Sequence, residues 1–175
     1  MRWMWIDQII QYEPDRRLVA IKNVSLAEEH LHDHFESGPD GDALPLMPTS
    51  LIIEGMAQTA GILVGTMSRF QEKVVLAKVV KATMEKDVVP GQTLRYEAEI
   101  ERYDPLGAST QGKIFRLTHP ETEWEQIGTI DLMFSHLDQN VSGIEFPEEN
   151  FVFSDNFKTI LQSAGLAHLA AIESE

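Results

Sequence analysis

The chain has 175 residues, enough for one domain with a sizeable core, and 43% of them are hydrophobic. Its net charge of −14 should repel nucleic acid and anionic lipid surfaces, so neither is an expected partner. Cysteine is absent, which excludes a disulfide framework, a thiolate nucleophile and a cysteine metal site.

The first ten residues, MRWMWIDQII, do not have the pattern of a signal peptide. Asp7 interrupts the apolar run, and no small-residue cleavage site follows it. A longer apolar stretch runs from residue 44 to 67, but it contains Glu54 and Gln58, and the run after Glu54 is too short to cross a bilayer. We therefore expect no membrane insertion and a cytoplasmic location.

The N-terminal third of the chain predicts two short extended elements, a loop and a long helix. A turn at Glu13-Pro14-Asp15 precedes a strand over Leu18–Val24. Gly, Pro and Asp mark residues 30–45 as a loop. A helix is expected from Thr49 or Ser50, either of which would cap its free amides, to about Arg69. The helix is apolar and rich in small residues, so a sheet is expected to wrap it closely.

The remainder predicts strands and then a final helix. Residues 94–101 alternate between apolar and charged side chains, as in a half-buried strand, and three more extended segments lie over 74–84, 112–119 and 126–137. One buried helix among antiparallel strands is an α+β plan. Residues 1–144 are expected to form the domain, and residues 145–175 a C-terminal helical extension that Gly165 kinks or ends.

Glu54 is the unusual side chain of the central helix. An ionised carboxylate among apolar residues is expensive to desolvate, so it either finds a partner or is readily protonated, as a general acid or base must be. The alternative is a glutamate near a helix start, where the helix dipole and solvent tolerate it.

His34 lies in the loop that precedes this helix, and a single loop histidine is most often a plain surface residue. His30, His32 and His34 alternate, however, so on an extended segment three imidazoles would share a face and offer ligands to a metal. Good tetrahedral angles are rare in that arrangement, and we expect no metal site.

These residues together resemble the active-site signature of the (3R)-hydroxyacyl-acyl-carrier-protein dehydratases. That family's pattern is H-F-P-G-x-P-x-M-P-G-x-L-x-x-E-A-M-A-Q. The matching residues of this chain are His34-Phe35, Pro45-Leu46-Met47-Pro48 and Leu51-Ile52-Ile53-Glu54-Gly55-Met56-Ala57-Gln58. The resemblance extends over about residues 3–137 and does not include the tail.

The resemblance implies a hot-dog fold, in which an antiparallel β-sheet wraps a central α-helix, and a homodimer or a multiple of dimers. It implies that His34 removes a proton from C2 of a 3-hydroxyacyl thioester. Glu54, which the partner subunit supplies in the family, would protonate the leaving hydroxyl. The backbone amide of Thr49 would polarise the thioester carbonyl. Gln58, one helical turn after Glu54, is expected to hydrogen-bond to the carboxyl and orient it.

The resemblance also implies the partners. No cofactor is expected, and the acyl group would arrive on the phosphopantetheine of acyl carrier protein or of coenzyme A. A short basic segment is the candidate contact for that carrier, with a solvated surface as the alternative. Its members are Arg69, Lys73, Lys78, Lys81 and Lys86.

Before Glu54, the chain departs from the family pattern in three places. Glu36-Ser37 replaces Pro-Gly, the loop between His34 and Glu54 has six extra residues, and Thr49 replaces the glycine after Met-Pro. Two alternatives therefore accompany the dehydratase. One is a non-catalytic hot-dog paralogue or partner subunit, and the other is an acyl thioesterase, which would use the helix carboxylate and water without His34.

Overall fold

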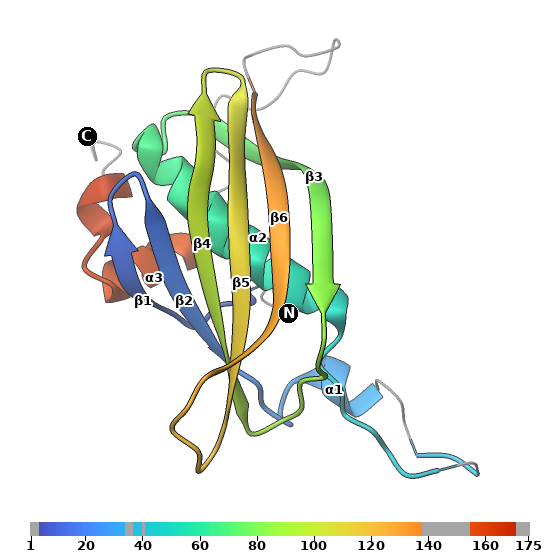
Figure 1. Ribbon diagram of the computed structural model, residues 1–175. Helices are drawn as coiled ribbons and strands as arrows, with labels where there is room; N and C mark the ends of the chain where they lie inside the picture. The colour runs from blue at the N-terminus through green and yellow to red at the C-terminus, as the bar shows by residue number, and fades with distance from the viewer. Residues whose placement is uncertain (1–3, 34–36, 40, 138–154, 171–175) are drawn as a thin grey trace.

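The computed structural model describes residues 4–33, 37–39, 41–137 and 155–170 (Figure 1). The predicted base His34 lies outside these residues. In chain order the elements are β1 (Gln8–Glu13), β2 (Arg17–Asn23), α1 (Glu29–Asp33), α2 (Thr49–Met67), β3 (Lys73–Met84), β4 (Gln92–Asp104), β5 (Gly107–Thr118), β6 (Glu125–Leu137), α3 (Asp155–Ser163) and the 3-10 helix η1 (Ala167–Ala170).

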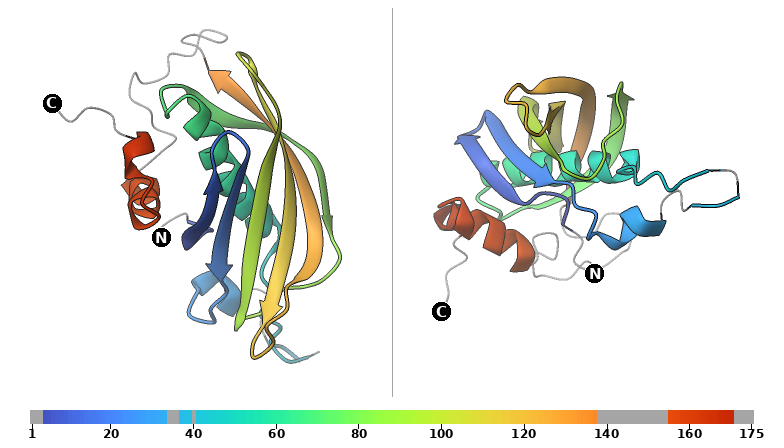
Figure 2. Two further views of the ribbon diagram at one scale, coloured as in Figure 1. Left: turned by 60° about the vertical axis from the view of Figure 1, so that its left-hand side comes forward. Right: turned by 90° about the horizontal axis from the view of Figure 1, so that it is seen from below.

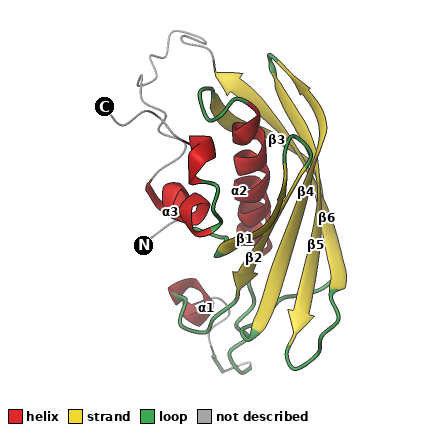
Figure 3. Cartoon of the chain, turned by 90° about the vertical axis from the view of Figure 1, so that its left-hand side faces the viewer, coloured by secondary structure: helices red, strands yellow, loops and turns green. Residues whose placement is uncertain are grey.

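The strands form one antiparallel sheet in the order β1-β2-β4-β5-β6-β3. The sheet curves, and α2 runs along its concave side (Figures 2 and 3). The predicted α+β plan, with an antiparallel sheet wrapped around a central helix, is therefore confirmed. β3 forms one edge of the sheet, although it comes directly after α2 in the chain, because it pairs with β6.

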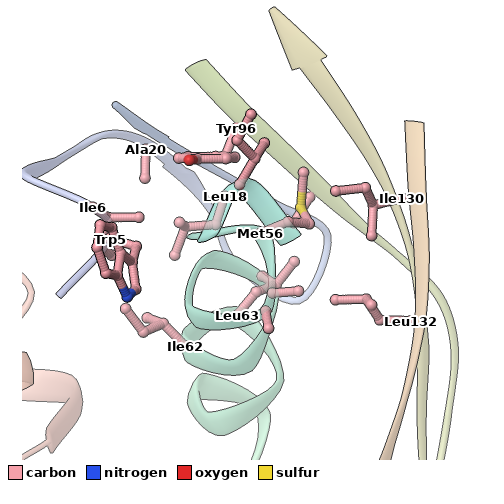
Figure 4. Packing of buried hydrophobic residues seen from close by; sticks show 14 of the residues in the cluster. Trp5, Ile6, Leu18, Ala20, Met56, Ile62, Leu63, Tyr96, Ile130 and Leu132 are labelled. Carbon is pink, nitrogen blue, oxygen red and sulfur yellow. The ribbon is translucent and has the colours of Figure 1, made fainter. Parts of the chain in front are cut away.

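Alternation along the strands decides which side chains meet α2. In β4, Leu94, Tyr96 and Ala98 are fully buried, while Glu99 and Glu101 on the opposite face are exposed. This is the pattern that period-2 alternation predicts for a strand with one face on the core. Figure 4 shows the resulting core, in which Tyr96 and Ile130 of the sheet face Met56 of the helix.

The small residues of α2 let the sheet approach the helix. Gly55 lies against the ring of Tyr96, and a methyl group at residue 55 would overlap the tyrosine hydroxyl. Length and hydropathy alone would allow α2 to span a membrane, but 61% of its most apolar window is buried inside the protein. A mostly buried core helix passes the same test, so the hydropathy of α2 is weak evidence for a membrane.

Two local predictions are wrong. Neither Thr49 nor Ser50 caps α2, because the helix begins one residue after Pro48, whose carbonyl accepts from the amides of Leu51 and Ile52 at 2.9 and 3.2 Å. No side chain caps this helix. The start of the predicted loop is also helical, since Glu29–Asp33 forms α1.

The metal-site alternative assumed an extended segment, whereas residues 29–33 form the helix α1. His34, the third histidine of that alternative, lies outside the described residues. Within the described ranges, no group of three His, Asp or Glu residues is placed to hold a metal ion.

The C-terminal extension contains the predicted helix. It packs against β1, with Ile160 and Leu161 buried in the main core (Figure 1). Gly165, at φ +71°, separates α3 from η1, as expected of a glycine that ends a helix.

The packing of Gly55 generates the first prediction. Gly55→Ala should lower the free energy of unfolding by about 1 to 3 kcal/mol, because the new methyl group overlaps the Tyr96 ring and lies 2.9 Å from the Trp5 carbonyl oxygen. Urea denaturation followed by circular dichroism measures this.

Gly61→Ala is the matched control on the same helix. A methyl group there meets only Phe134 Cε1, at 3.6 Å, so the higher helix propensity of alanine should stabilise the protein by up to about 1 kcal/mol. Equal effects of the two variants would contradict the close contact between α2 and the sheet.

Candidate active site

Glu54 lies in the second turn of α2 and is half-buried. Gln58, one turn further along, donates from Nε2 to Glu54 Oε1 at 3.0 Å. The hydrogen bond expected between these two residues is therefore present. It fixes one oxygen of the carboxyl group against the helix surface.

Gln58 is itself held from the other side. Its Oε1 accepts from the main-chain N–H of Trp5 at 2.9 Å, and both residues are buried, with 6% and 5% of their surface exposed. The amide thus links the N-terminal segment to the carboxyl group through two hydrogen bonds. Sequence patterns did not indicate the Trp5 contact, because the two residues are 53 positions apart.

Thr49 is the first residue of α2. No side chain caps the helix, and the Thr49 amide lies at the N-terminal, positive end of the helix dipole. A carbonyl oxygen that gains negative charge would be stabilised at such a position. The replacement of the family's glycine by Thr49 keeps this N–H donor.

A depression of about 180 Å³ opens beside Thr49, between the start of α2 and the end of β3. Its apolar wall consists of Met47, Ile52, Met84 and Val88. Its polar rim consists of Thr49, Glu85, Lys86 and Asp87. Glu54 is not among the residues that line it, so this depression contains the predicted carbonyl-binding amide without the predicted acid of the same chain.

The five basic residues predicted to contact a carrier do not lie together. Arg69 follows the C-terminal end of α2, whereas Lys86 lines the depression near the N-terminal end of the helix. Lys73, Lys78 and Lys81 are spread along β3, whose 12 residues extend over about 40 Å at the usual rise per residue. Of the five, Lys86 alone lines the depression beside Thr49.

An ion cluster around a buried lysine holds the start of α1. The ammonium group of Lys22, which is 7% exposed, hydrogen-bonds to the carboxylates of Asp7 and Glu28 and to the Asn23 carbonyl. Glu28 directly precedes α1, and α1 ends one position before His34. The cluster therefore anchors the segment that leads to the predicted base. Sequence alternation did not reveal it, because a lysine in a strand is normally exposed.

Tyr96 places a hydroxyl group under the acid-bearing helix, next to Gly55. Among the described residues this hydroxyl has no hydrogen-bond partner. Burial raises the pKa of Tyr96 above its usual value, and the charges of Asp7 and Glu28 raise it further, so the phenol stays protonated. In the family pattern the residue after the glutamate is alanine, and here glycine leaves room for the tyrosine ring.

Comparison with known proteins identifies the family. A family model described as the FabA-like domain matches residues 2–115. This chain belongs to the FabA-like family. The match includes Trp5, the whole of α2 and the loop that carries His34, and it ends before β6.

Two curated relatives illustrate the FabA-like match. The 3-hydroxyacyl-acyl-carrier-protein dehydratase FabZ of Solibacter usitatus is 42% identical over 100 residues, which are 56% of this chain and 57% of that protein. FabZ of Koribacter versatilis is 36% identical over 112 residues, or 63% of this chain and 68% of that protein. The aligned region thus spans little more than half of the Solibacter relative.

Solved structures share the fold. A chain of the dehydratase heterocomplex ApeI:P from Xenorhabdus doucetiae aligns with a TM-score of 0.57 at 17% identity, over 78% of this chain and 85% of that one. A thioesterase family protein from Silicibacter pomeroyi aligns with a TM-score of 0.57 at 11% identity, over 74% and 83%. The hot-dog fold of this FabA-like chain is shared by proteins named dehydratase and thioesterase, so the fold alone does not choose between them.

His119, His136 and His168 are not part of the family signature. His119 Nε2 lies 3.2 Å from Thr93 Oγ1, and His136 Nδ1 lies 3.1 Å from Glu72 Oε2. His168 lies on η1 and is exposed. None of the three lines the depression beside Thr49.

The buried hydroxyl of Tyr96 generates the second prediction. Tyr96→Phe should leave the free energy of unfolding unchanged or raise it by up to about 1 kcal/mol, because it removes a desolvated hydroxyl that gains no hydrogen bond in return. Urea denaturation of the two proteins measures the difference.

Tyr103→Phe is the matched control. The Tyr103 hydroxyl donates to Glu72 Oε2 at 3.3 Å, so its removal should lower stability by about 0.5 kcal/mol. A loss larger than about 1 kcal/mol in Tyr96→Phe would mean that the buried hydroxyl makes a stabilising hydrogen bond after all.

Proposed function

We propose that this chain is a (3R)-hydroxyacyl thioester dehydratase of the fatty-acid synthesis type, a hydro-lyase that forms a trans-2-enoyl thioester. The observation that carries the proposal is the half-buried Glu54 carboxyl, held by Gln58 on an otherwise apolar helix. Membership of the FabA-like family and the relatives named FabZ dehydratase support the same reaction.

In the proposed reaction, His34 removes the C2 proton of the substrate. The electrons of the C2–H bond form the C2=C3 double bond as the C3–O bond breaks, and Glu54 protonates the departing hydroxyl so that it leaves as water. The Thr49 amide donates to the thioester oxygen while charge accumulates there. Loss of water leaves the overall oxidation state unchanged, so the reaction requires no redox cofactor.

The substrate is proposed to be an acyl group on phosphopantetheine, carried by acyl carrier protein or coenzyme A in the cytoplasm. Lys86 is the basic residue placed to contact a phosphate of that arm, since it lines the depression with Thr49. Glu85 and Asp87 flank it, and the chain as a whole carries a net charge of −14. Long-range attraction to an acidic carrier is therefore weak, and recognition is expected to depend on contacts at short range.

We further propose a homodimer formed through β3, either alone or as the unit of a larger assembly. No described strand covers the outer edge of β3, and Leu76, Val79 and Val80 on this strand are 40%, 39% and 51% exposed. An edge strand with exposed apolar residues readily pairs with another strand. In such a dimer the partner subunit would supply the acid to the depression beside Thr49, as the family resemblance implies.

The reaction generates the third prediction. The wild-type protein should convert a 3-hydroxyacyl thioester to its 2-enoyl product, measured by enoyl absorbance, and should also catalyse the reverse hydration. His34→Ala and Glu54→Gln should each lower kcat by about 10² to 10⁴, because each removes one proton-transfer group.

The exposed residues His168 and Glu123 provide the matched controls, His168→Ala and Glu123→Gln, which should retain wild-type activity. Hydrolysis of acyl thioesters that survives His34→Ala, without dehydration, would instead establish the thioesterase. Absence of both activities, on carrier-protein and coenzyme A substrates of several lengths, would establish a non-catalytic hot-dog protein.

The exposed face of β3 generates the fourth prediction. Val80→Glu should convert the dimer to a monomer, measured by light scattering after gel filtration, because it places a charge in an apolar strand pairing. Dehydratase activity should fall as the fraction of dimer falls.

Leu106→Glu is the control, since Leu106 is 83% exposed in the hairpin between β4 and β5. A wild-type monomer, or an undiminished Val80→Glu dimer, would contradict the proposed interface.

A further inference from the structure

Trp5 connects to the proposed acid from outside α2, through the amide of Gln58. It belongs to the buried core that surrounds α2 (Figure 4). Its main-chain N–H donates to Gln58 Oε1 at 2.9 Å, and Gln58 Nε2 donates to Glu54 Oε1 at 3.0 Å. Trp5 and Gln58 are buried, so water does not compete strongly for these hydrogen bonds.

The direction of the chain of hydrogen bonds follows from its first member. A main-chain N–H can only donate, so the Gln58 atom that faces Trp5 must be the carbonyl oxygen. The NH₂ group of Gln58 is thereby turned toward Glu54 as a donor. If the amide were reversed, NH₂ would face N–H and two oxygens would face each other, which is unfavourable at both ends.

We propose that Trp5 is a positioning residue for the proposed dehydration: its peptide N–H fixes the Gln58 amide, and that amide fixes the carboxyl group of Glu54. This inference rests on the proposed function. Oε1 of Glu54 accepts from Gln58, so this hydrogen bond holds the carboxyl group in one orientation on the helix.

The side chain of Trp5 makes a second contact with the catalytic region. Its indole ring meets the His30 imidazole at an angle of 76°, with the ring centroids 4.9 Å apart. His30 belongs to α1, which ends one position before His34. The ring of Trp5 thus contacts the segment that leads to the proposed base. Its main chain binds Gln58, which holds the proposed acid.

Two variants of Gln58 distinguish a positioning role of its amide from a purely structural one. Gln58→Glu keeps an oxygen to accept from Trp5, but an ionised carboxylate there cannot donate to Glu54 and repels it. Gln58→Met introduces a side chain of similar length that makes neither hydrogen bond. If the amide merely fastened the N-terminal segment, Gln58→Met would lose stability and Gln58→Glu would retain activity.

The closing experiment measures kcat and KM for dehydration in three variants, and it gives the fifth prediction. Gln58→Glu, Gln58→Met and an ester at Trp5, made by incorporating the α-hydroxy analogue of tryptophan, should each lower kcat by about tenfold or more. KM should stay within about threefold of wild type, because these groups do not contact the acyl chain in the proposed reaction. The ester removes the peptide N–H and leaves the indole ring in place.

Gln162→Glu and Gln162→Met, at an exposed glutamine of α3, are the matched controls and should retain kcat within about threefold. A wild-type enzyme that dehydrates, with kcat unchanged in Gln58→Glu or in the ester, would overturn this inference and leave the proposed function standing. A wild-type protein without dehydratase activity would overturn both.

Discussion

A carboxyl group on the helix at the centre of the core is the constraint on which the rest of the site depends. Moving a carboxylate out of water costs roughly several kcal/mol unless the carboxylate is paired or hydrogen-bonded. Gln58 supplies the hydrogen bond from the same face of α2, and Trp5 fixes Gln58 from the N-terminal segment. The carboxyl group is thus held by a neutral amide, which is itself fixed by a main-chain N–H.

This constraint also explains why the N-terminal segment packs as it does. Residues 4–6 precede β1 and lie against α2, where Trp5 and Ile6 are among the buried core residues. Asp7, the next residue, accepts from Lys22 and from the amide of Asn23, which secures the segment to the end of β2. The same lysine holds Glu28 at the start of α1. One buried ammonium therefore fixes both the support of the proposed acid and the start of the helix that leads to the proposed base.

The parts of the fold that follow from periodicity could be predicted from the sequence, and the contacts between distant segments could not. Alternation in β4 identified the buried residues Leu94, Tyr96 and Ala98, and the apolar run from residue 49 identified α2. The predicted side-chain cap is absent because the N-cap residue is Pro48, whose side chain has no hydrogen-bond acceptor. The five basic residues are close in sequence, but an extended strand separates them in space, so Arg69 and Lys86 lie near opposite ends of α2. Glu54 and Gln58 were predictable because a helix places positions four apart on one face, whereas the Trp5–Gln58 contact depends on how segments 53 residues apart pack.

The departures from the family pattern divide into two physical kinds. Gly55, in place of alanine, is matched inside the core by Tyr96, whose ring fills the space that a methyl group would occupy. A change of this kind must be compensated locally, because a packed interior tolerates neither overlap nor a void. Thr49 keeps the one atom that the proposed chemistry needs, its amide hydrogen, at the uncapped start of α2. The longer loop before Pro45 carries no such packing constraint where Gly38, Pro39 and Asp42 are exposed, so its length can vary while the acid and its supports stay in place. The range of substrates is therefore expected to differ from that of relatives with the short loop, while the reaction stays the same. The reason is that the core fixes Glu54, whereas the surface loop decides which substrates reach it.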